Sequence, residues 1–153
     1  MNVRLNVMEK KTNAVSGLQQ IGKFLHQSPL DNRILDLVYM RASQINGCAM
    51  CMEIHSKDLL AAGEDPQRIF LLEAWSEAPF YSEKERAALA YTEALTRLGD
   101  HPVSDAVFDE LKRLFSDEEI VDLTMGIVTI NGFNRINIAF GAPVGTYKVG
   151  QFK

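Results

Sequence analysis

Apolar residues recur through most of this chain at intervals of three and four, the spacing that places side chains on one face of an α-helix. The segment 28–45 shows the pattern clearly, with one apolar stripe formed by Ile34, Leu35, Val38, Ala42 and Ile45. Strict alternation of apolar and polar residues, which would indicate strands, is weak throughout. The β-branched run 126–130 lies inside a long periodic segment with a clear start, so we assign it to a helix as well. The pattern therefore predicts an all-α fold.

Capping and breaking residues divide this pattern into about seven helices. Ser82 with Glu85, and Ser116 with Glu119, have the spacing of capping boxes, and Ser104 is a further candidate N-cap. We expect helices over the segments 12–28, 28–45, 48–63, 65–75, 82–98, 104–115 and 116–140. We expect the tail after them to be irregular. No repeat, low-complexity run or Ser/Gly-rich linker interrupts the chain, so we expect a single domain spanning residues 1–153.

The composition is that of a soluble globular domain, and it excludes several classes of partner. Of 153 residues, 46% are hydrophobic and 24% are charged, and the formal net charge is −4. Lys and Arg are scattered, so the chain lacks the basic patch with which proteins bind nucleic acid or anionic membranes. No run reaches the roughly 18 apolar residues of a membrane-spanning helix, and the first residues lack the apolar core of a signal peptide. We therefore expect a cytoplasmic protein, in a compartment that keeps thiols reduced.

The only two cysteines, Cys48 and Cys51, lie three residues apart at the start of one expected helix. At about 100° per residue, both fall with His55 in a sector of roughly 60° on that helix. Asn46 and Gly47 come just before, where they suit a turn or a helix start. The first turn of a helix has unpaired N–H groups and a favourable dipole, which stabilise a thiolate over a thiol. A low thiol pKa makes a cysteine nucleophilic near neutral pH, so the pattern favours redox-active thiols.

Four other interpretations of the cysteine pair make different predictions. A structural zinc site needs about four ligands, but beyond His55 only His26 and His101 remain, and neither has a partner nearby. Two buried thiols could pack as small hydrophobic groups, although the face shared with His55 argues against this. A thioredoxin-type site would require alternating strands and helices, which are missing. A structural disulfide is disfavoured by the reducing compartment, and it would close a very short loop.

The segment 41–63, RASQINGCAMCMEIHSKDLLAAG, resembles the core motif of the alkylhydroperoxidase D-like (AhpD-like) family, within the carboxymuconolactone decarboxylase superfamily. The tryptophan in the segment 72–96 and the late sequence INGFNR support the resemblance, which covers about residues 30–138. The resemblance implies an AhpD-like helical fold and a homo-oligomer, usually a trimer or hexamer. Apolar residues on more than one side of the expected helices at 68–75 and 126–130 also favour an assembly of several chains.

The resemblance implies an antioxidant thiol peroxidase, which reduces organic hydroperoxides to alcohols while its cysteine pair becomes a disulfide. In the family the second motif cysteine, here Cys51, attacks the peroxide, and the first, here Cys48, resolves the product. His55 matches the motif histidine of a proton relay. The family also has an acidic residue twelve positions before the first cysteine. That position is Asp36 here, whereas a Glu is commoner, so a shorter carboxyl would have to serve the relay.

The residues alone leave two of these assignments open. The helix N-terminus favours Cys48 as the more acidic thiol, whereas His55 four residues later favours Cys51. Only the resemblance selects Cys51 as the attacking sulfur. Asp36 lies opposite the main apolar stripe, so it is either a partly buried relay carboxyl or an ordinary surface charge.

The resemblance also implies that no cofactor is bound. Electrons would come from an external dithiol, such as a lipoyl-bearing protein, and the other partner would be a small hydroperoxide. Two other functions stay open: a decarboxylase-type enzyme of the same superfamily, which would not need the two thiols, and a non-catalytic redox sensor or partner-binding protein. On the last expected helix we interpret a polar cluster as buried hydrogen-bonding groups or subunit contacts: Asn131, Asn134 and Arg135.

Overall fold

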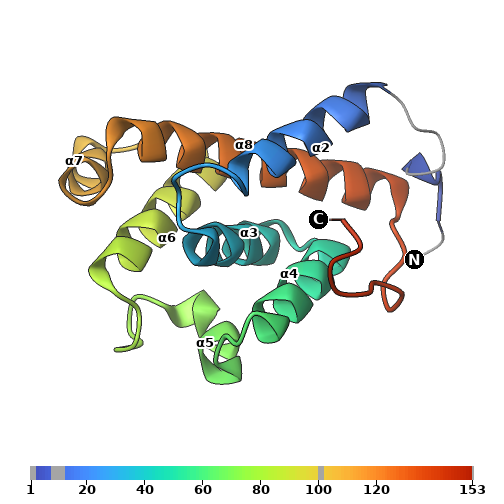
Figure 1. The fold of residues 1–153 in the computed structure, drawn as a ribbon, viewed down its shortest axis with the longest axis horizontal. Coiled ribbons are helices and arrows are strands. Elements are labelled where there is room, and N and C mark those ends of the chain that lie inside the picture. Colours follow the sequence, from blue (N-terminus) through green and yellow to red (C-terminus); the bar gives the residue numbers. More distant parts are fainter. Residues whose placement is uncertain (1–2, 8–12, 100–101, 153) are drawn as a thin grey trace.

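Helices form all of the regular structure in the described part of the chain. The computed structural model describes residues 3–7, 13–99 and 102–152. Position 12, where we expected the first helix to begin, and His101 lie outside these residues. These ranges contain seven α-helices, a short 3-10 helix and no strand: α2 (Asn13–Leu25), α3 (Asn32–Asn46), α4 (Ala49–Ala61), α5 (Pro66–Phe70), η1 (Leu72–Ala74), α6 (Glu83–Thr96), α7 (Asp105–Leu114) and α8 (Asp117–Phe140). Figure 1 shows how these helices are arranged. The all-α prediction is confirmed.

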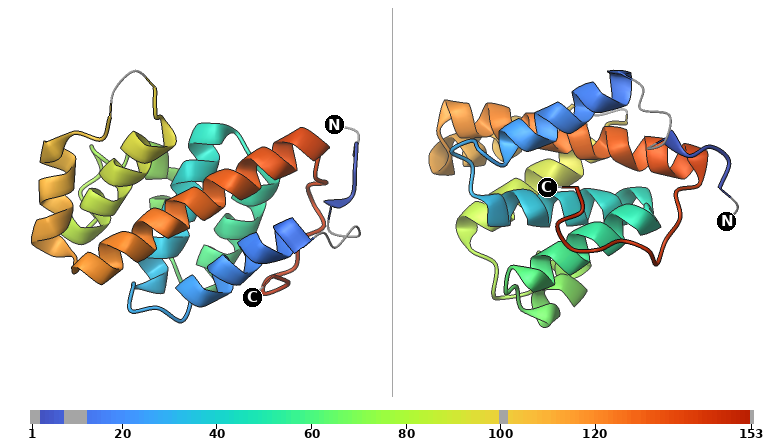
Figure 2. Two further views of the ribbon diagram at one scale, coloured as in Figure 1. Left: turned by 90° about the horizontal axis from the view of Figure 1, so that it is seen from above. Right: turned by 45° about the vertical axis from the view of Figure 1, so that its right-hand side comes forward.

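The helices are arranged in two layers (Figure 2). The long helix α8 lies beside α2 in one layer, and α3 runs beneath them with α4 and α6 packed on either side. Helix α7 packs against α6, at the end of the molecule opposite α4. The C-terminal segment turns back after α8 and runs along α4. The helix with the two cysteines therefore lies between α3, the end of α8 and this segment.

Helix α3 lies at the centre and has no exposed face in its middle. Asp31 is its N-cap and accepts a hydrogen bond at 2.8 Å from the N–H two residues later. Every residue from 34 to 43 is buried. Most of the predicted stripe packs into a cluster shared with α2, α6, α7 and α8, whereas Leu37 and Met40 enter a second cluster with α4, α5 and α6. Because both faces are covered, the polar residues of α3 need partners inside the protein.

Helix α8 crosses α3 closely at a glycine. A Cβ atom built on Gly126 would lie 2.7 Å from Leu35 Cδ1, so no larger residue fits there unless Leu35 moves. The β-branched run 126–130 is helical because most of it is buried against neighbouring helices, and this burial outweighs its intrinsic preference for strands. Gly141 ends the helix in the left-handed conformation, with φ of 68°.

The predicted caps set the starts of three helices. Ser82 and Ser116 each accept a hydrogen bond from the backbone N–H three residues later, and the glutamate at that position bonds back to the backbone N–H of the serine. Both capping boxes are therefore confirmed. Ser104 caps α7 in the same way, without the returning bond of a capping box. These starts are local properties, which is why the sequence alone predicts them.

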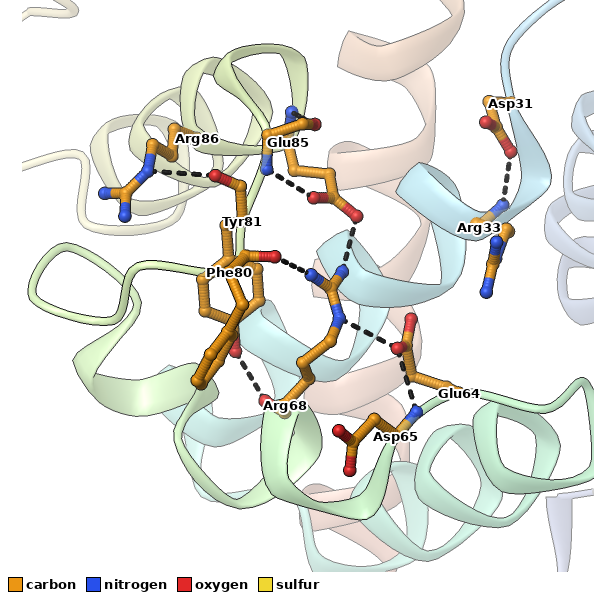
Figure 3. Close-up of polar contacts among 10 residues, drawn as sticks. Asp31, Arg33, Glu64, Asp65, Arg68, Phe80, Tyr81, Glu85 and Arg86 are labelled. Atoms are coloured by element: carbon orange, nitrogen blue, oxygen red, sulfur yellow. Dashed lines mark hydrogen bonds and ion pairs between the residues drawn. The ribbon is translucent and has the colours of Figure 1, made fainter.

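The helix expected over residues 65–75 divides into α5 and η1. The Tyr81 hydroxyl donates to the Arg68 carbonyl at 2.5 Å. This carbonyl therefore accepts a hydrogen bond from a side chain in place of the helical bond from a backbone N–H. The guanidinium of Arg68 bridges Glu64 and Glu85, with N···O distances of 2.8 and 2.5 Å (Figure 3). This partly buried ion cluster joins the segment after α4 to the start of α6.

A second ion pair anchors the C-terminal half of α3 to α6. Arg41 is 4% exposed, and its Nε donates to Glu93 Oε1 at 2.9 Å. Trp75 Nε1 donates to the same carboxylate oxygen at 2.8 Å. Burial alone would raise the pKa of Glu93, but the hydrogen bonds from Trp75 and Arg41 and the Arg41 charge hold that pKa below its usual range.

Replacing Glu93 with Gln should lower the free energy of unfolding at pH 7 by about 2 kcal/mol, because the buried Arg41 charge loses its counter-charge. Since the pKa of Glu93 is lowered in the folded protein, its ionisation stabilises the fold above the unfolded-state value of 4.5. That contribution is lost as the pH falls through the lower folded-state pKa, so parent and variant should converge in acid. Urea unfolding at several pH values measures both effects.

The matched control for this prediction is Glu110→Gln, which removes an exposed ion pair with Arg113. It should leave the free energy of unfolding nearly unchanged at pH 7, because water and salt screen exposed pairs. Equal losses in the two variants, or a gap between parent and Glu93→Gln that stays constant in acid, would contradict this account of Glu93.

Candidate functional site

The two cysteines lie at the junction where α3 ends and α4 begins. Gly47 ends α3 with φ of 68°, a left-handed conformation that glycine adopts at little cost, and its N–H donates to the Gln44 carbonyl at 3.2 Å. The Cys48 N–H donates to the Ser43 carbonyl at 3.0 Å, and Cys48 is itself the N-cap of α4. No linker separates the two helices. The position of Cys48 therefore depends directly on the end of α3.

The two sulfurs are joined in a disulfide. Cys48 and Cys51 have their Cα atoms 5.3 Å apart, and the Cys51 N–H donates to Cys48 Sγ at 3.3 Å. Both residues are almost fully buried, at 1% and 2% exposed. The first turn of α4 thus brings the sulfurs together, as the three-residue spacing predicts. Two thiols that packed only as separate small hydrophobic groups would not be joined in this way.

A network of side-chain amides fixes the end of α3 just before the cysteines. Asn46 Nδ2 donates to the Oδ1 atoms of Asn131 and Asn134, both at 2.9 Å. Asn134 Nδ2 donates to Ser43 Oγ at 3.0 Å. Arg135 is exposed and donates to the carbonyl and side-chain oxygens of Asn131. Asn131 and Asn134 therefore join α8 to the end of α3, whereas the bonds from Arg135 to Asn131 lie within α8.

His55 follows Cys51 by one turn of α4 and contacts a tyrosine from α3. The rings of His55 and Tyr39 have centroids 5.1 Å apart and are inclined by 50°. His55 is partly buried, whereas Tyr39 is only 6% exposed. In the described part of the chain the Tyr39 hydroxyl has no hydrogen-bond partner. Our sequence analysis did not single out Tyr39 as a functional residue, although it lies three positions after Asp36 and so near it on one side of the helix.

Asp36 is buried, with 7% of its surface exposed. Its interpretation as an ordinary surface charge is therefore wrong, because neighbouring helices cover the side of α3 opposite the main stripe. Burial, and then the charge of Asp36, raise the pKa of Tyr39 well above its usual range. Asp36 and Tyr39 thus lie on the part of α3 that meets His55 of α4.

An asparagine that our sequence analysis missed contacts the second cysteine. Asn137, near the end of α8, donates from Nδ2 to Cys51 Sγ at 3.3 Å. No signal in the sequence identifies it, because 86 positions separate the two residues and several asparagines lie in the same segment. The site therefore draws side chains from α3, α4 and α8.

The C-terminal segment is anchored along α4. The Tyr147 hydroxyl lies 2.9 Å from both carboxylate oxygens of Asp58, which is on the helix face that carries the cysteines. Lys57 Nζ donates to the Tyr147 carbonyl at 3.0 Å, and the Gly145 N–H donates to Glu53 at 2.6 Å. Burial and the bond to Asp58 raise the pKa of Tyr147 to about 12. The tail has no helix in its described residues, as expected, but its place is well defined.

The described residues contain neither a candidate metal site nor a candidate membrane-spanning helix. Among residues 3–7, 13–99 and 102–152, no three His, Cys, Asp or Glu side chains are grouped as ligands for a metal ion. In the same ranges, no helix has both the length and the apolar character needed to cross a membrane.

Comparisons with known proteins agree on one family. The model of the carboxymuconolactone decarboxylase family matches residues 14–94, a range that contains both cysteines. The uncharacterised protein YdfG of Bacillus subtilis is 36% identical over 141 residues, which cover 92% of this chain and 96% of YdfG. A solved protein of unknown function from Agrobacterium tumefaciens, described as a putative antioxidant defence protein AhpD, is 35% identical with a TM-score of 0.90. The match covers 95% of this chain and all of that one.

A more distant solved structure shares only the fold. The debrominase Bmp8, in complex with 2,3,4-tribromopyrrole, has a TM-score of 0.80 at 22% identity, and the match covers 91% of this chain and 74% of Bmp8. The same arrangement of helices therefore occurs in a debrominase and in a protein described as a putative antioxidant defence protein, so the fold alone does not determine the activity. The family model matches residues 14–94, and the sequence is similar to YdfG and to the Agrobacterium protein over nearly its whole length. This chain therefore belongs to the carboxymuconolactone decarboxylase family and has the AhpD-like helical fold.

Proposed function

We propose that this protein is a thiol-dependent peroxidase that reduces organic hydroperoxides, with Cys48 and Cys51 cycling between a dithiol and a disulfide. The observation that carries the proposal is the disulfide in the first turn of α4, where Cys48 is the N-cap. A redox pair needs two sulfurs that can bond without refolding, and one helical turn provides this. The family, and the similarity to an Agrobacterium protein described as a putative antioxidant defence protein, support the same chemistry.

In the first step the Cys51 thiolate attacks the terminal oxygen of the hydroperoxide. The O–O bond breaks, the sulfur is oxidised to a sulfenic acid, and the alkoxide takes a proton to become the alcohol. His55 supplies that proton, since its unperturbed pKa of about 6.5 lets it act as acid and base near neutral pH. Residues four apart are neighbours on a helix surface, which suits His55 to serve Cys51.

In the second step Cys48 attacks the sulfur of the sulfenic acid. An S–S bond forms, and the oxygen leaves as water after taking up a proton. An external dithiol then restores the pair by exchange and is itself oxidised to a disulfide. A lipoyl-bearing protein is our candidate for this donor, and the scheme needs no bound cofactor.

Asp36 and Tyr39 support His55 in this scheme. A buried carboxylate one helical turn from Tyr39 adds negative charge on the side of α3 where the Tyr39 ring meets His55. Negative charge nearby favours the imidazolium, which is the form that donates a proton to the alkoxide. Asp36 therefore acts as a positioning and electrostatic residue rather than as a group that touches the peroxide.

The same proposal includes a homo-oligomer located in the cytoplasm, and the family resemblance implies a trimer or hexamer. Helix α8 exposes Val121, Met125 and Val128 at the spacing of one helical face, with 61%, 36% and 50% of their surfaces exposed. A second copy of the chain could cover this apolar face. A reducing compartment would supply the thiols that restore the dithiol.

Consumption of cumene hydroperoxide in excess dihydrolipoamide tests the peroxidase proposal. The parent protein should turn over many equivalents, while Cys51→Ser should be slower by about a hundredfold or more because the nucleophile is gone. Cys48→Ser should also lose turnover, because no disulfide can form. Consumption that stops after one equivalent would point instead to a single-use redox sensor. Lactone decarboxylation that survives in the double variant Cys48→Ser, Cys51→Ser would point to the decarboxylase-type enzyme.

Trapping of the sulfenic acid tests which cysteine attacks. After one equivalent of peroxide, Cys48→Ser should carry a sulfenic acid on Cys51, because the resolving sulfur is absent. Cys51→Ser should remain reduced. Mass spectrometry of the trapped adducts locates the sulfenic acid in each variant. A sulfenic acid found only in Cys51→Ser would mean that Cys48 attacks the peroxide and Cys51 resolves the product.

Replacing His55 with Gln should slow peroxide reduction by about a hundredfold and should weaken its dependence on pH, because the proton donor is lost. The matched control is His26→Gln. The His26 ring also meets Tyr39, edge-on at 6.4 Å, but its Nδ1 pairs with Asn32 Oδ1 at 3.0 Å. The control should keep the parental rate and pH profile. Equal losses in both variants would show that packing around Tyr39, and not proton transfer, explains the effect.

A further inference from the structure

Asn137, near the end of α8, bonds one sulfur of the redox pair through its side-chain amide, at 3.3 Å from Cys51 Sγ. We infer that Asn137 is a further catalytic residue: its amide holds Cys51 as the anion and so makes Cys51, rather than Cys48, both the attacking sulfur and the leaving sulfur. The attack on peroxide rests on the function proposed above. The effect on the sulfur itself needs no substrate.

Burial of Cys51 makes such a donor important. Cys51 is 2% exposed, and removing a sulfur from water raises the pKa of its thiol unless the anion is compensated. A hydrogen bond to a neutral disulfide is weak, but the same N–H bonded to a thiolate is charge-assisted and stronger. The amide therefore favours the anion over the neutral forms of the sulfur, which is the direction that lowers the pKa of the thiol.

Cys48 accepts its hydrogen bond from a different source. Its Sγ accepts the backbone N–H of Cys51 at 3.3 Å, a group that belongs to the first turn of α4 itself. This bond does not depend on any side chain of another helix, whereas the bond to Cys51 depends on a single side chain of α8. Asn137 can therefore be replaced while the donor to Cys48 stays in place.

The turn that carries Asn137 is held firmly. Its carbonyl accepts the N–H groups of Gly141 and Ala142, which closes the C-terminal end of α8. One turn earlier, Asn134 is fully buried and bonded to Ser43 Oγ. A donor that is already positioned needs little reorganisation when negative charge develops on its acceptor.

The same bond directs the reduction of the disulfide. A thiolate of the external dithiol attacks Cys48 Sγ, the S–S bond breaks, and its electron pair goes to Cys51 Sγ, which leaves as the thiolate bonded to Asn137. A leaving thiol of lower pKa departs faster. The second thiol of the donor, after losing its proton to water, attacks the donor sulfur in the mixed disulfide and releases Cys48. One dithiol is thus oxidised for each disulfide reduced.

Titration of the Cys51 thiolate by its ultraviolet absorbance tests the inference in the Cys48→Ser protein, with the spectrum of the double cysteine variant subtracted. Asn137→Leu removes the donor at similar volume and should raise the midpoint by about one pH unit. Asn137→Asp should raise it at least as far, because its carboxylate repels the thiolate. The matched control is Thr124→Val, on the same helix, which removes a hydroxyl that bonds the Tyr91 hydroxyl and belongs neither to the sulfur's surroundings nor to the amide network at the end of α3. It should lower thermal stability and leave the midpoint unchanged.

A second measurement locates the attack of the reductant. Oxidised protein treated briefly with a small monothiol and quenched in acid should carry the adduct on Cys48, and Asn137→Leu should move part of it to Cys51. An unchanged midpoint in Asn137→Leu, an equal change in Thr124→Val, or an adduct mainly on Cys51 of the parent would overturn the inference. Neither measurement contains peroxide. If Asn137→Leu raises the titration midpoint of Cys51 but the parent protein consumes no hydroperoxide, the role of Asn137 stands and only the peroxidase proposal fails.

Discussion

Burial of α3 on both faces is the constraint on which the rest of the structure depends. A helix without an exposed middle must pack its polar side chains against other helices of the protein, where most of them find hydrogen-bond partners. In this stretch α3 carries four such residues: Asp36, Tyr39, Arg41 and Ser43. Arg41 forms an ion pair with a glutamate of α6, and Ser43 accepts a hydrogen bond from an asparagine of α8. The ring of Tyr39 packs against the histidine of α4. The polar residues of one buried helix therefore fix the positions of three others, and the candidate site forms where two of these, α4 and α8, meet α3.

The cysteine pair is placed by helix ends and not by a loop. Because α3 ends at Gly47 and Cys48 caps the next helix, the amide network that holds the end of α3 also holds the first sulfur. The second sulfur takes its hydrogen bond from α8. The two sulfurs lie one turn apart, yet their hydrogen-bond donors differ. The Cys48 sulfur accepts a backbone N–H of its own helix, and the Cys51 sulfur accepts a side-chain amide from α8. This difference gives two chemically similar groups separate roles.

Most of the fold follows from local patterns, and the part of the site that does not is formed by contacts between distant segments. Periodicity and capping residues act within about four positions, so the helical segments, the capping boxes and the spacing of Cys48 and Cys51 could all be predicted. A helical wheel assigns a residue to one side of its helix, but it does not show what lies against that side. For this reason the burial of Asp36, and the contact between Asn137 and Cys51, could not be predicted. The break between α5 and η1 has the same origin, since it coincides with a bond from Tyr81.

Gly126 and Leu35 share a space that holds only one side chain, since a Cβ on the glycine would stand 2.7 Å from the leucine. Volume at this crossing can be exchanged between the two helices but not added. A relative with alanine in place of the glycine would need a smaller residue opposite, so the two positions should covary across the family. Gly126 and Leu35 thus set the distance between the layer of α8 and the layer of α3. The contact of α8 with the cysteines therefore depends on a pair of residues that touch neither sulfur.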